Sequence, residues 1–318
     1  MSRFDCTRTM TAGEMIAAIG HPARLVGDGA RRIDLLASLS AVKPGALCFI
    51  KADDPAPGQR LEALSGLSVV LAEDAQVDAA IASRHTLIHV PDPRRYYIRA
   101  FRLLVGTDAP ATPGIAPGAF VHPDAQLGPN VSVGHGASIA AGVRIGPDCV
   151  IMAGVHIYEG TRIGTGVLIQ ANTVVGSVGQ SYEREEDGAF LLMPHLAEVV
   201  IEDHVRIGTN STIVRGTLQD TVIGAATVVG NHVNIGHNVT VGRRCHVGAG
   251  SIICGSSRLG DDCWISPGVT VKSVAVGERA MIGAAALVTR PVAAGKFVTG
   301  VPAREAIRAT AYNLTTGR

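Results

Sequence analysis

The chain has 318 residues, of which 47% are hydrophobic, 4% aromatic and 17% charged, and its formal net charge is +1. So small a charge excludes binding to nucleic acid or to an anionic membrane by bulk electrostatics, and any partner must be recognised by a local site. The sequence has no apolar run long enough for a membrane span and its first ten residues lack the apolar stretch of a secretion signal, so we expect neither.

The cysteines indicate a reduced protein. None of the six forms a CxxC pair, and a chain with a large repeat core needs no disulfides to hold it. Cys245 and Cys263 are separated by 18 residues but Cys254 breaks the spacing, so small buried side chains are a better interpretation than metal ligands. We therefore expect a cytoplasmic protein.

The first part of the chain, residues 1–106, predicts a small α/β domain. Residues 11–105 show no regular repeat. Thr11 and Glu14 have the spacing of a capping box before an apolar pair, which predicts a helix near residues 12–19. The remaining predictions are buried strands at 67–70 and 86–90, followed by a helix at 94–105.

From Ile115 to Val175 an aliphatic residue recurs at every sixth position. A period of six matches neither a helix nor a single strand, but it fits a coil of three short strands that stacks on the next coil and points one aliphatic residue inward from each strand. The pattern predicts a parallel β-helix over residues 107–303. The first run consists of Ile115, Val121, Leu127, Val133, Ile139, Ile145, Ile151, Ile157, Ile163, Ile169 and Val175.

The interruptions of this period predict outward insertions, because a solenoid tolerates extra residues as loops on its faces. The clean period stops at Val175 and resumes at Ile201, so residues 176–198 should form a loop or a partly extruded coil. A long second run extends from Ile223 to Val271. Residues 304–318 are expected to form a short cap, with helix over 304–312.

Among the 11 histidines, His237 stands in the most suggestive context, Asn234-Ile235-Gly236-His237-Asn238. Histidine is the natural general base at neutral pH. Because Ile235 points inward, His237 should lie at a turn or on an outer face, where it can meet a neighbouring subunit. From the period alone, a solvated surface histidine is the simpler interpretation, and the same holds for His232.

A metal site is a weaker alternative. Trimeric β-helices of the γ-class carbonic anhydrase type hold zinc between subunits with three histidines, and His232 and His237 have the separation of that family's paired ligands. The nearest third ligand, His195, lies within the irregular segment, where its position cannot be predicted. We therefore expect no metal.

Several segments resemble the UDP-3-O-acylglucosamine N-acyltransferases of lipid A synthesis. In the first domain the resemblance rests on Gly27, Ile33 and residues 37–39 and 43–49. In the solenoid it rests on 207–208, 212–213, 215–218, 220–224 and 235–239, and it is most specific from Glu202 to Val241.

The resemblance implies a left-handed parallel β-helix, a homotrimer with active sites between subunits, and His237 as the general base in N-acylation of a nucleotide-linked amino sugar. The acyl donor would be a thioester co-substrate, acyl carrier protein with its phosphopantetheine or CoA, with no cofactor bound permanently. The first domain would recognise the nucleotide sugar. The substrate-binding candidates are Phe49, which would stack on the uracil, Asn234, Asn238 and His232.

The sequence also departs from that family. Ala52 and Pro55 stand where the family has an asparagine and a tyrosine after Phe49, and Val214 stands where it has an aspartate. The end of the chain, at 282–289 and 300–303, resembles acetyl-CoA-dependent hexapeptide transferases. An acetyl-CoA-dependent nucleotide-sugar N-acetyltransferase of surface-glycan synthesis therefore stays open, as does a non-catalytic scaffold.

The length of the acyl group should depend on the segment 176–198. It contains Phe190, Leu191 and Met193, part of the most apolar outward stretch of the chain. We expect these side chains to line an acyl channel beside His237, because a long acyl chain is selected only where an apolar channel receives it.

Overall fold

The computed structural model describes residues 5–106 and 112–305. The chain divides into two compact units, Met1–Pro110 and Ala111–Arg318.

The first unit contains a mixed sheet whose six strands, within the described residues, have the order β1-β3-β4-β5-β6-β2. The four inner strands run parallel, whereas β1 and β2 pair antiparallel at the two edges. The strands are β1 (Asp5–Thr11), β2 (Arg24–Val26), β3 (Arg32–Leu36), β4 (Ala46–Phe49), β5 (Ser68–Ala72) and β6 (Thr86–Val90).

The helices of this unit follow local signals. The side chain of Thr11 accepts from the backbone N–H of Glu14 and the Glu14 carboxylate caps Thr11 in return, so the predicted capping box and helix are confirmed. The predicted strands near 67–70 and 86–90 and the later helix are also present. The helices are α1 (Ala12–Ile19), α2 (Ala79–Ala82), α3 (Pro93–Val105) and the short 3₁₀ turns Leu39–Ala41 and Gln59–Leu61.

Both faces of the sheet are buried. Leu47 packs with α1 and α3 on one face, whereas its neighbour Cys48 packs with Leu61 on the other. Since successive residues of a strand point to opposite faces, a strand covered on both sides is mostly apolar, as β5 is from Val69 to Ala72.

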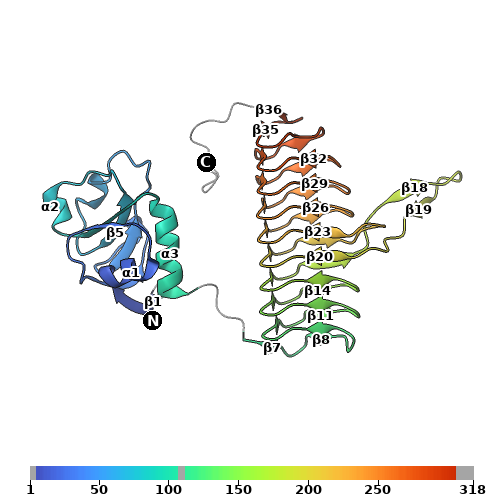
Figure 1. Ribbon diagram of the computed structural model, residues 1–318, viewed down its shortest axis with the longest axis horizontal. Coiled ribbons are helices and arrows are strands. Elements are labelled where there is room, and N and C mark those ends of the chain that lie inside the picture. Colours follow the sequence, from blue (N-terminus) through green and yellow to red (C-terminus); the bar gives the residue numbers. More distant parts are fainter. Residues whose placement is uncertain (1–4, 107–111, 306–318) are drawn as a thin grey trace. The chain divides into compact units, whose positions relative to one another are not determined.

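The second unit is a left-handed parallel β-helix (Figure 1). Over the described residues its coils form three sheets. The first contains β7 (Gly114–Ile115), β10 (Ser132–Val133), β13 (Val150–Ile151), β16 (Leu168–Ile169), β21 (Arg206–Ile207), β24 (Val228–Val229), β27 (His246–Val247), β30 (Trp264–Ile265), β33 (Met281–Ile282), β35 (Phe297–Thr299) and the antiparallel β36 (Arg304–Glu305).

The other two sheets complete each coil. One contains β8 (Phe120–Val121), β11 (Ser138–Ile139), β14 (His156–Ile157), β17 (Val174–Ser177), β22 (Thr212–Val214), β25 (Asn234–Ile235), β28 (Ile252–Ile253), β31 (Thr270–Val271) and β34 (Leu287–Val288). The other contains β9 (Gln126–Leu127), β12 (Arg144–Ile145), β15 (Arg162–Ile163), β20 (Val199–Ile201), β23 (Thr221–Ile223), β26 (Thr240–Val241), β29 (Arg258–Leu259) and β32 (Ala275–Val276).

The aliphatic period is explained by the register. Ile235 pairs with Ile253 on the next coil, and both side chains are fully buried in one continuous core. The prediction of inward residues is wrong at the first coil, where Ile115 is 55% exposed because no coil lies beneath it. Stacking, and not the residue type alone, buries each position.

The segment 176–198 is an insertion, as predicted, but it is ordered as an antiparallel hairpin of β18 (Tyr182–Arg184) and β19 (Phe190–Leu192). Figure 1 shows this hairpin projecting from the side of the solenoid. The predicted terminal helix is wrong at its start, since Arg304 and Glu305 pair with β35 as a strand, and residues 306–312 of that prediction lie outside the described residues. None of the helices in the described part of the chain is long and apolar enough to span a membrane.

Candidate active site

His237 lies at a corner of the β-helix, two residues after β25 and before β26. The following residue, Asn238, has a φ of 58°, a left-handed conformation that asparagine tolerates and that turns the chain. The imidazole lies over the next coil at Gly255, where an added Cβ would be 2.5 Å from Nε2 of His237. Glycine at 255 therefore leaves room for the ring.

The ring of His237 packs against a second histidine. The centroid of the His195 ring lies 5.4 Å away, and the two ring planes are nearly perpendicular at 85°. His195 follows the projecting hairpin and is only 6% exposed. Its Nδ1 lies 2.8 Å from the carbonyl oxygen of Met193.

The surroundings favour a neutral His237. Burial lowers the pKa of His237, and positive charge on His195 lowers it further, while the Asn238 side chain opposes the shift. A base must be unprotonated to accept a proton, so a depressed pKa keeps this imidazole competent at neutral pH. The geometry supports His237 as a base better than it supports a solvated surface histidine.

Asn238 and Arg215 hold the corner together. The Oδ1 of Asn238 accepts from the backbone N–H of Thr217 at 2.6 Å, and its amide donates to the Thr217 hydroxyl at 2.9 Å. Arg215 donates to the carbonyl oxygens of Ala197 and Glu159, at 3.0 and 2.9 Å, and so ties the end of the insertion to the solenoid. The Asn238 side chain therefore already has hydrogen-bond partners within the chain, and these bonds hold the corner in place.

Asn234 and His232 lie close to His237 in sequence but differ from it in burial. Asn234 points outward from β25 and is exposed. His232 is exposed at the preceding corner, with a φ of 57°. Across the described residues, no three His, Cys, Asp or Glu side chains are grouped so that they could hold a metal ion.

The candidate acyl-channel residues lie on the hairpin and at its end. Phe190, Leu191 and Met193 are 65%, 57% and 42% exposed. Phe190 packs edge-on against Tyr182, with ring centroids 5.8 Å apart, and the Arg184 guanidinium lies 4.4 Å from its centroid. Within a single chain these residues form an exposed apolar surface, and the residue of the insertion that packs against His237 is His195.

Phe49 lies in the first unit at the carboxyl end of β4. Its ring packs on Tyr97, with centroids 5.0 Å apart, and it lines a cavity of about 620 Å³. The charged residues of this cavity are Lys51, Arg60, Asp53 and Asp54, and Arg60 pairs with Asp54 at 3.1 Å. An aromatic face suits a base, and Lys51 is the cationic side chain left for a phosphate.

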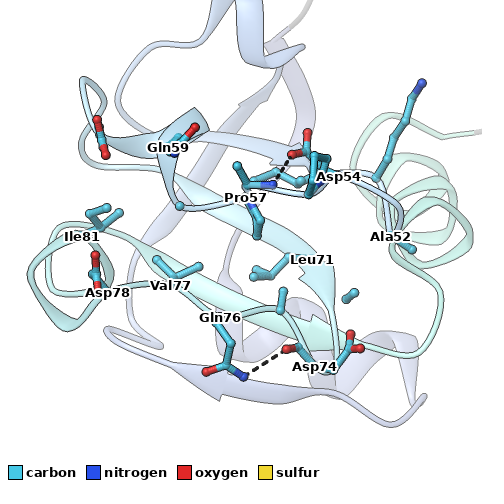
Figure 2. Close-up of a pocket in the computed structure, with 18 residues that line it drawn as sticks. Ala52, Asp54, Pro57, Gln59, Leu71, Asp74, Gln76, Val77, Asp78 and Ile81 are labelled. Carbon is cyan, nitrogen blue, oxygen red and sulfur yellow. Dashed lines mark hydrogen bonds between the residues drawn. The ribbon is translucent and has the colours of Figure 1, made fainter.

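A second cavity of about 650 Å³ lies between the loops that follow β4 and β5 (Figure 2). Its charged lining is mostly acidic, with Asp54, Glu62, Asp74 and Asp78 against Lys51. Negative charge on this scale opposes a diphosphate. Of the two cavities, the one at Phe49 is therefore the better candidate for a nucleotide.

Sequence reasoning named His195 only as a possible third metal ligand and did not predict that its ring packs against His237. The two residues are 42 positions apart, His195 lies outside the hexad period, and its neighbours match no motif. The hairpin brings them together, and hairpin geometry depends on tertiary packing.

A β-helix of six-residue repeats with a partly buried histidine at a corner, its pKa lowered by burial, is typical of a hexapeptide-repeat transferase. Known sequence patterns agree: one described as bacterial transferase hexapeptide (six repeats) matches residues 142–177, and one described as hexapeptide repeat of succinyl-transferase matches 198–218, 219–253 and 238–273. The chain belongs to the UDP-3-O-acylglucosamine N-acyltransferase family and is an acyltransferase.

Two relatives carry that family name. The protein of Aromatoleum aromaticum is 42% identical over 225 residues, which cover 66% of this chain and 65% of the relative. The protein of Delftia acidovorans is 38% identical over 300 residues, which cover 91% and 85%. A crystal structure of a UDP-N-acetylglucosamine acyltransferase from Bacteroides fragilis is similar with a TM-score of 0.56 and 27% identity, over 61% of this chain and 74% of that one.

Proposed function

We propose that the protein transfers an acyl group from a thioester carrier to the amine of a nucleotide-linked amino sugar, as in the UDP-3-O-acylglucosamine step of lipid A synthesis. The observation that carries this proposal is His237, a partly buried imidazole with a lowered pKa at a corner of the β-helix, in a chain of this family.

The chemistry follows from the position of the base. The sugar nitrogen attacks the thioester carbonyl carbon while His237 takes a proton from that nitrogen, so a C–N bond forms. Backbone N–H groups steady the oxyanion of the tetrahedral intermediate. The C–S bond then breaks, and the proton leaves with the thiol of acyl carrier protein or CoA. No permanently bound cofactor or metal takes part.

A homotrimer supplies the second wall of the site. Along the first sheet of the solenoid, the outward apolar side chain of Val228 is 40% exposed. Packing such faces around a threefold axis buries them and forms three equivalent clefts. Light scattering should give three times the chain mass of 32.9 kDa, whereas a monomer at micromolar concentration contradicts the trimer.

The donor is expected to carry a long acyl chain, because the hairpin side chains Phe190, Leu191 and Met193 are apolar and exposed in one chain. Asn234 and His232 point outward near His237 and are placed to contact the sugar. The nucleotide is assigned to the cavity at Phe49. The six cysteines form no disulfide in the described part of the chain, and we assign the protein to the cytoplasm on this basis.

The direct test offers the purified protein acyl-carrier and acyl-CoA donors of increasing length, with UDP- and dTDP-linked amino sugars as acceptors. Amide formation with UDP-3-O-acylglucosamine and a long acyl-carrier donor supports the proposal. A preference for acetyl-CoA over every longer donor moves the protein to the acetyltransferase alternative. No turnover with any thioester, from protein that is folded, contradicts both.

A further inference from the structure

The histidine pair contains two buried ring nitrogens that make no hydrogen bond, Nδ1 of His237 and Nε2 of His195. The Nδ1 of His195 lies 2.8 Å from the carbonyl oxygen of Met193. A carbonyl only accepts, so this Nδ1 carries the proton of the neutral ring and Nε2 of His195 is a hydrogen-bond acceptor. Buried polar groups are nearly always paired, so an acceptor left open beside a base requires an explanation.

The two open nitrogens are complementary. The buried Nδ1 of His237 faces the protein, which leaves Nε2 to take the substrate proton. A neutral imidazole that accepts at Nε2 must carry its own proton at Nδ1, and that N–H needs an acceptor. The ring centroids are 5.4 Å apart and each ring nitrogen lies roughly 1.1 Å from its centroid, so the two nitrogens can approach to about 3.2 Å when both point along the line between the rings. The two nitrogens make no hydrogen bond in the structure, and rotation of the rings would bring them into range.

His195 also fills the space beside Val214. A Cβ added at Gly179 would lie 2.7 Å from Nε2 of His195 and 2.8 Å from Cγ1 of Val214, so both groups pack on the same glycine. Val214 is 8% exposed and apolar, and it offers no acceptor to His237. Asn238 also lies beside the imidazole, but its Oδ1 already accepts from the backbone N–H and the hydroxyl of Thr217, whereas Nε2 of His195 has no partner.

We propose that His195 is the positioning residue of the active site: its Nε2 accepts the Nδ1 proton of His237, so that Nε2 of His237 is held free and aimed at the amine. This inference rests on the proposed role of His237 as the base. It assigns the acceptor beside His237 to a neutral imidazole that the hairpin insertion delivers.

The test compares His195→Phe, which keeps a ring but removes the acceptor, with His195→Gln, which keeps an acceptor oxygen. His195→Phe should lower kcat about 10- to 100-fold, less than loss of the base, with KM changed less than about twofold. His195→Gln should stay within about threefold of the unaltered protein. Adding Val214→Asp to His195→Phe should recover most of the lost kcat.

A readout that needs no substrate separates this inference from the proposed function. Imidazole ¹⁵N shifts should show His237 protonated at Nδ1 in the unaltered protein and as a tautomer mixture in His195→Phe. The matched control is His85→Phe, which replaces a buried histidine of the first unit whose ring nitrogens also lack a hydrogen bond, and should change neither kcat nor the His237 tautomer.

Two results would overturn the inference. One is His195→Phe with an unchanged kcat and an unchanged His237 tautomer. The other is an equal loss in His195→Phe, His195→Gln and the double variant, which would give His195 a packing role only. If the unaltered protein turns over no thioester but the ¹⁵N shifts change as expected, the proposed function fails and the histidine pairing stands.

Discussion

The two units of the protein build their cores differently. In the solenoid each strand pairs with the equivalent strand of the next coil, commonly 18 residues on, as Ile235 does with Ile253. In the first unit the edge strand β2 pairs with β6, so that Leu25 meets Ile88 across more than 60 residues. A repeated core can be extended or interrupted without loss of its pattern, whereas a mixed sheet depends on every distant pairing at once.

The two candidate sites, at His237 and at Phe49, are also built in different ways. The solenoid corner holds His237 through contacts with the next coil and with one insertion, whereas the cavity at Phe49 is formed by loops at the carboxyl ends of parallel strands. Changes at the corner should alter catalysis and leave the fold intact. Changes in either core should alter stability in one unit only.

The largest effect is expected at the corner. His237→Ala should lower kcat by about 10² to 10⁴, the usual contribution of general-base catalysis, without altering the unfolding transition. Steady-state kinetics and thermal unfolding check this. The control is His232→Ala, an exposed corner histidine that should change kcat far less, and equal losses in both variants would mean that the base is misassigned.

Truncating buried side chains should show that the two units unfold in separate transitions. Leu47→Ala in the first unit and Ile253→Ala in the solenoid each remove a fully buried side chain and should each cost about 2 to 5 kcal/mol. Each should lower the denaturant midpoint of its own unit alone. Ile115→Ala, at the exposed first coil, should cost far less. If Leu47→Ala also lowers the solenoid transition, the units unfold together and the comparison fails.

A smaller effect is expected on the hairpin. If Phe190 lines the acyl channel, kcat/KM should rise with acyl length to roughly ten carbons or more, since each buried methylene contributes about 0.8 kcal/mol, and Phe190→Ala should flatten that rise. Leu218→Ala is the control, because Leu218 is apolar and 73% exposed but lies outside the hairpin. An unchanged length dependence in Phe190→Ala would place the acyl chain elsewhere.

The smallest effect concerns pH. Burial lowers the pKa of His85 and His89 in the first unit below the ordinary value of 6.5. The unfolded chain then binds more protons than the folded one, so stability present above pH 6.5 is lost as the pH falls towards the folded pKa, by at most about 1.4 kcal/mol per group and pH unit.

Denaturant unfolding at pH 7 and pH 5.5 measures this loss. The double variant His85→Gln and His89→Gln should flatten the pH dependence of the first unit alone. The solenoid should keep its own pH dependence of stability, because burial also lowers the pKa of His237 and His246. A double variant with the same acid sensitivity as the unaltered protein would contradict the assignment to these two residues.

The sequence by itself determined whatever depends on short-range regularity. The six-residue period predicts the coils because each coil repeats its neighbour, and the Thr11 capping box predicts α1 because all its contacts lie within one turn. The corner position of His237 also follows, since it is counted from the inward Ile235.

Only the tertiary structure decided what depends on distant contacts. The edge strands β1 and β2 exist through pairing partners that no local pattern specifies. The end strand β36 forms on β35 where a helix was predicted, because an open sheet edge offers hydrogen bonds that a short isolated helix lacks. The packing of His195 against His237 is also a tertiary result. The insertion has no periodicity and folds as a hairpin, and the hydrogen bond from Arg215 to Ala197 fixes the end of the insertion so that His195 packs against His237.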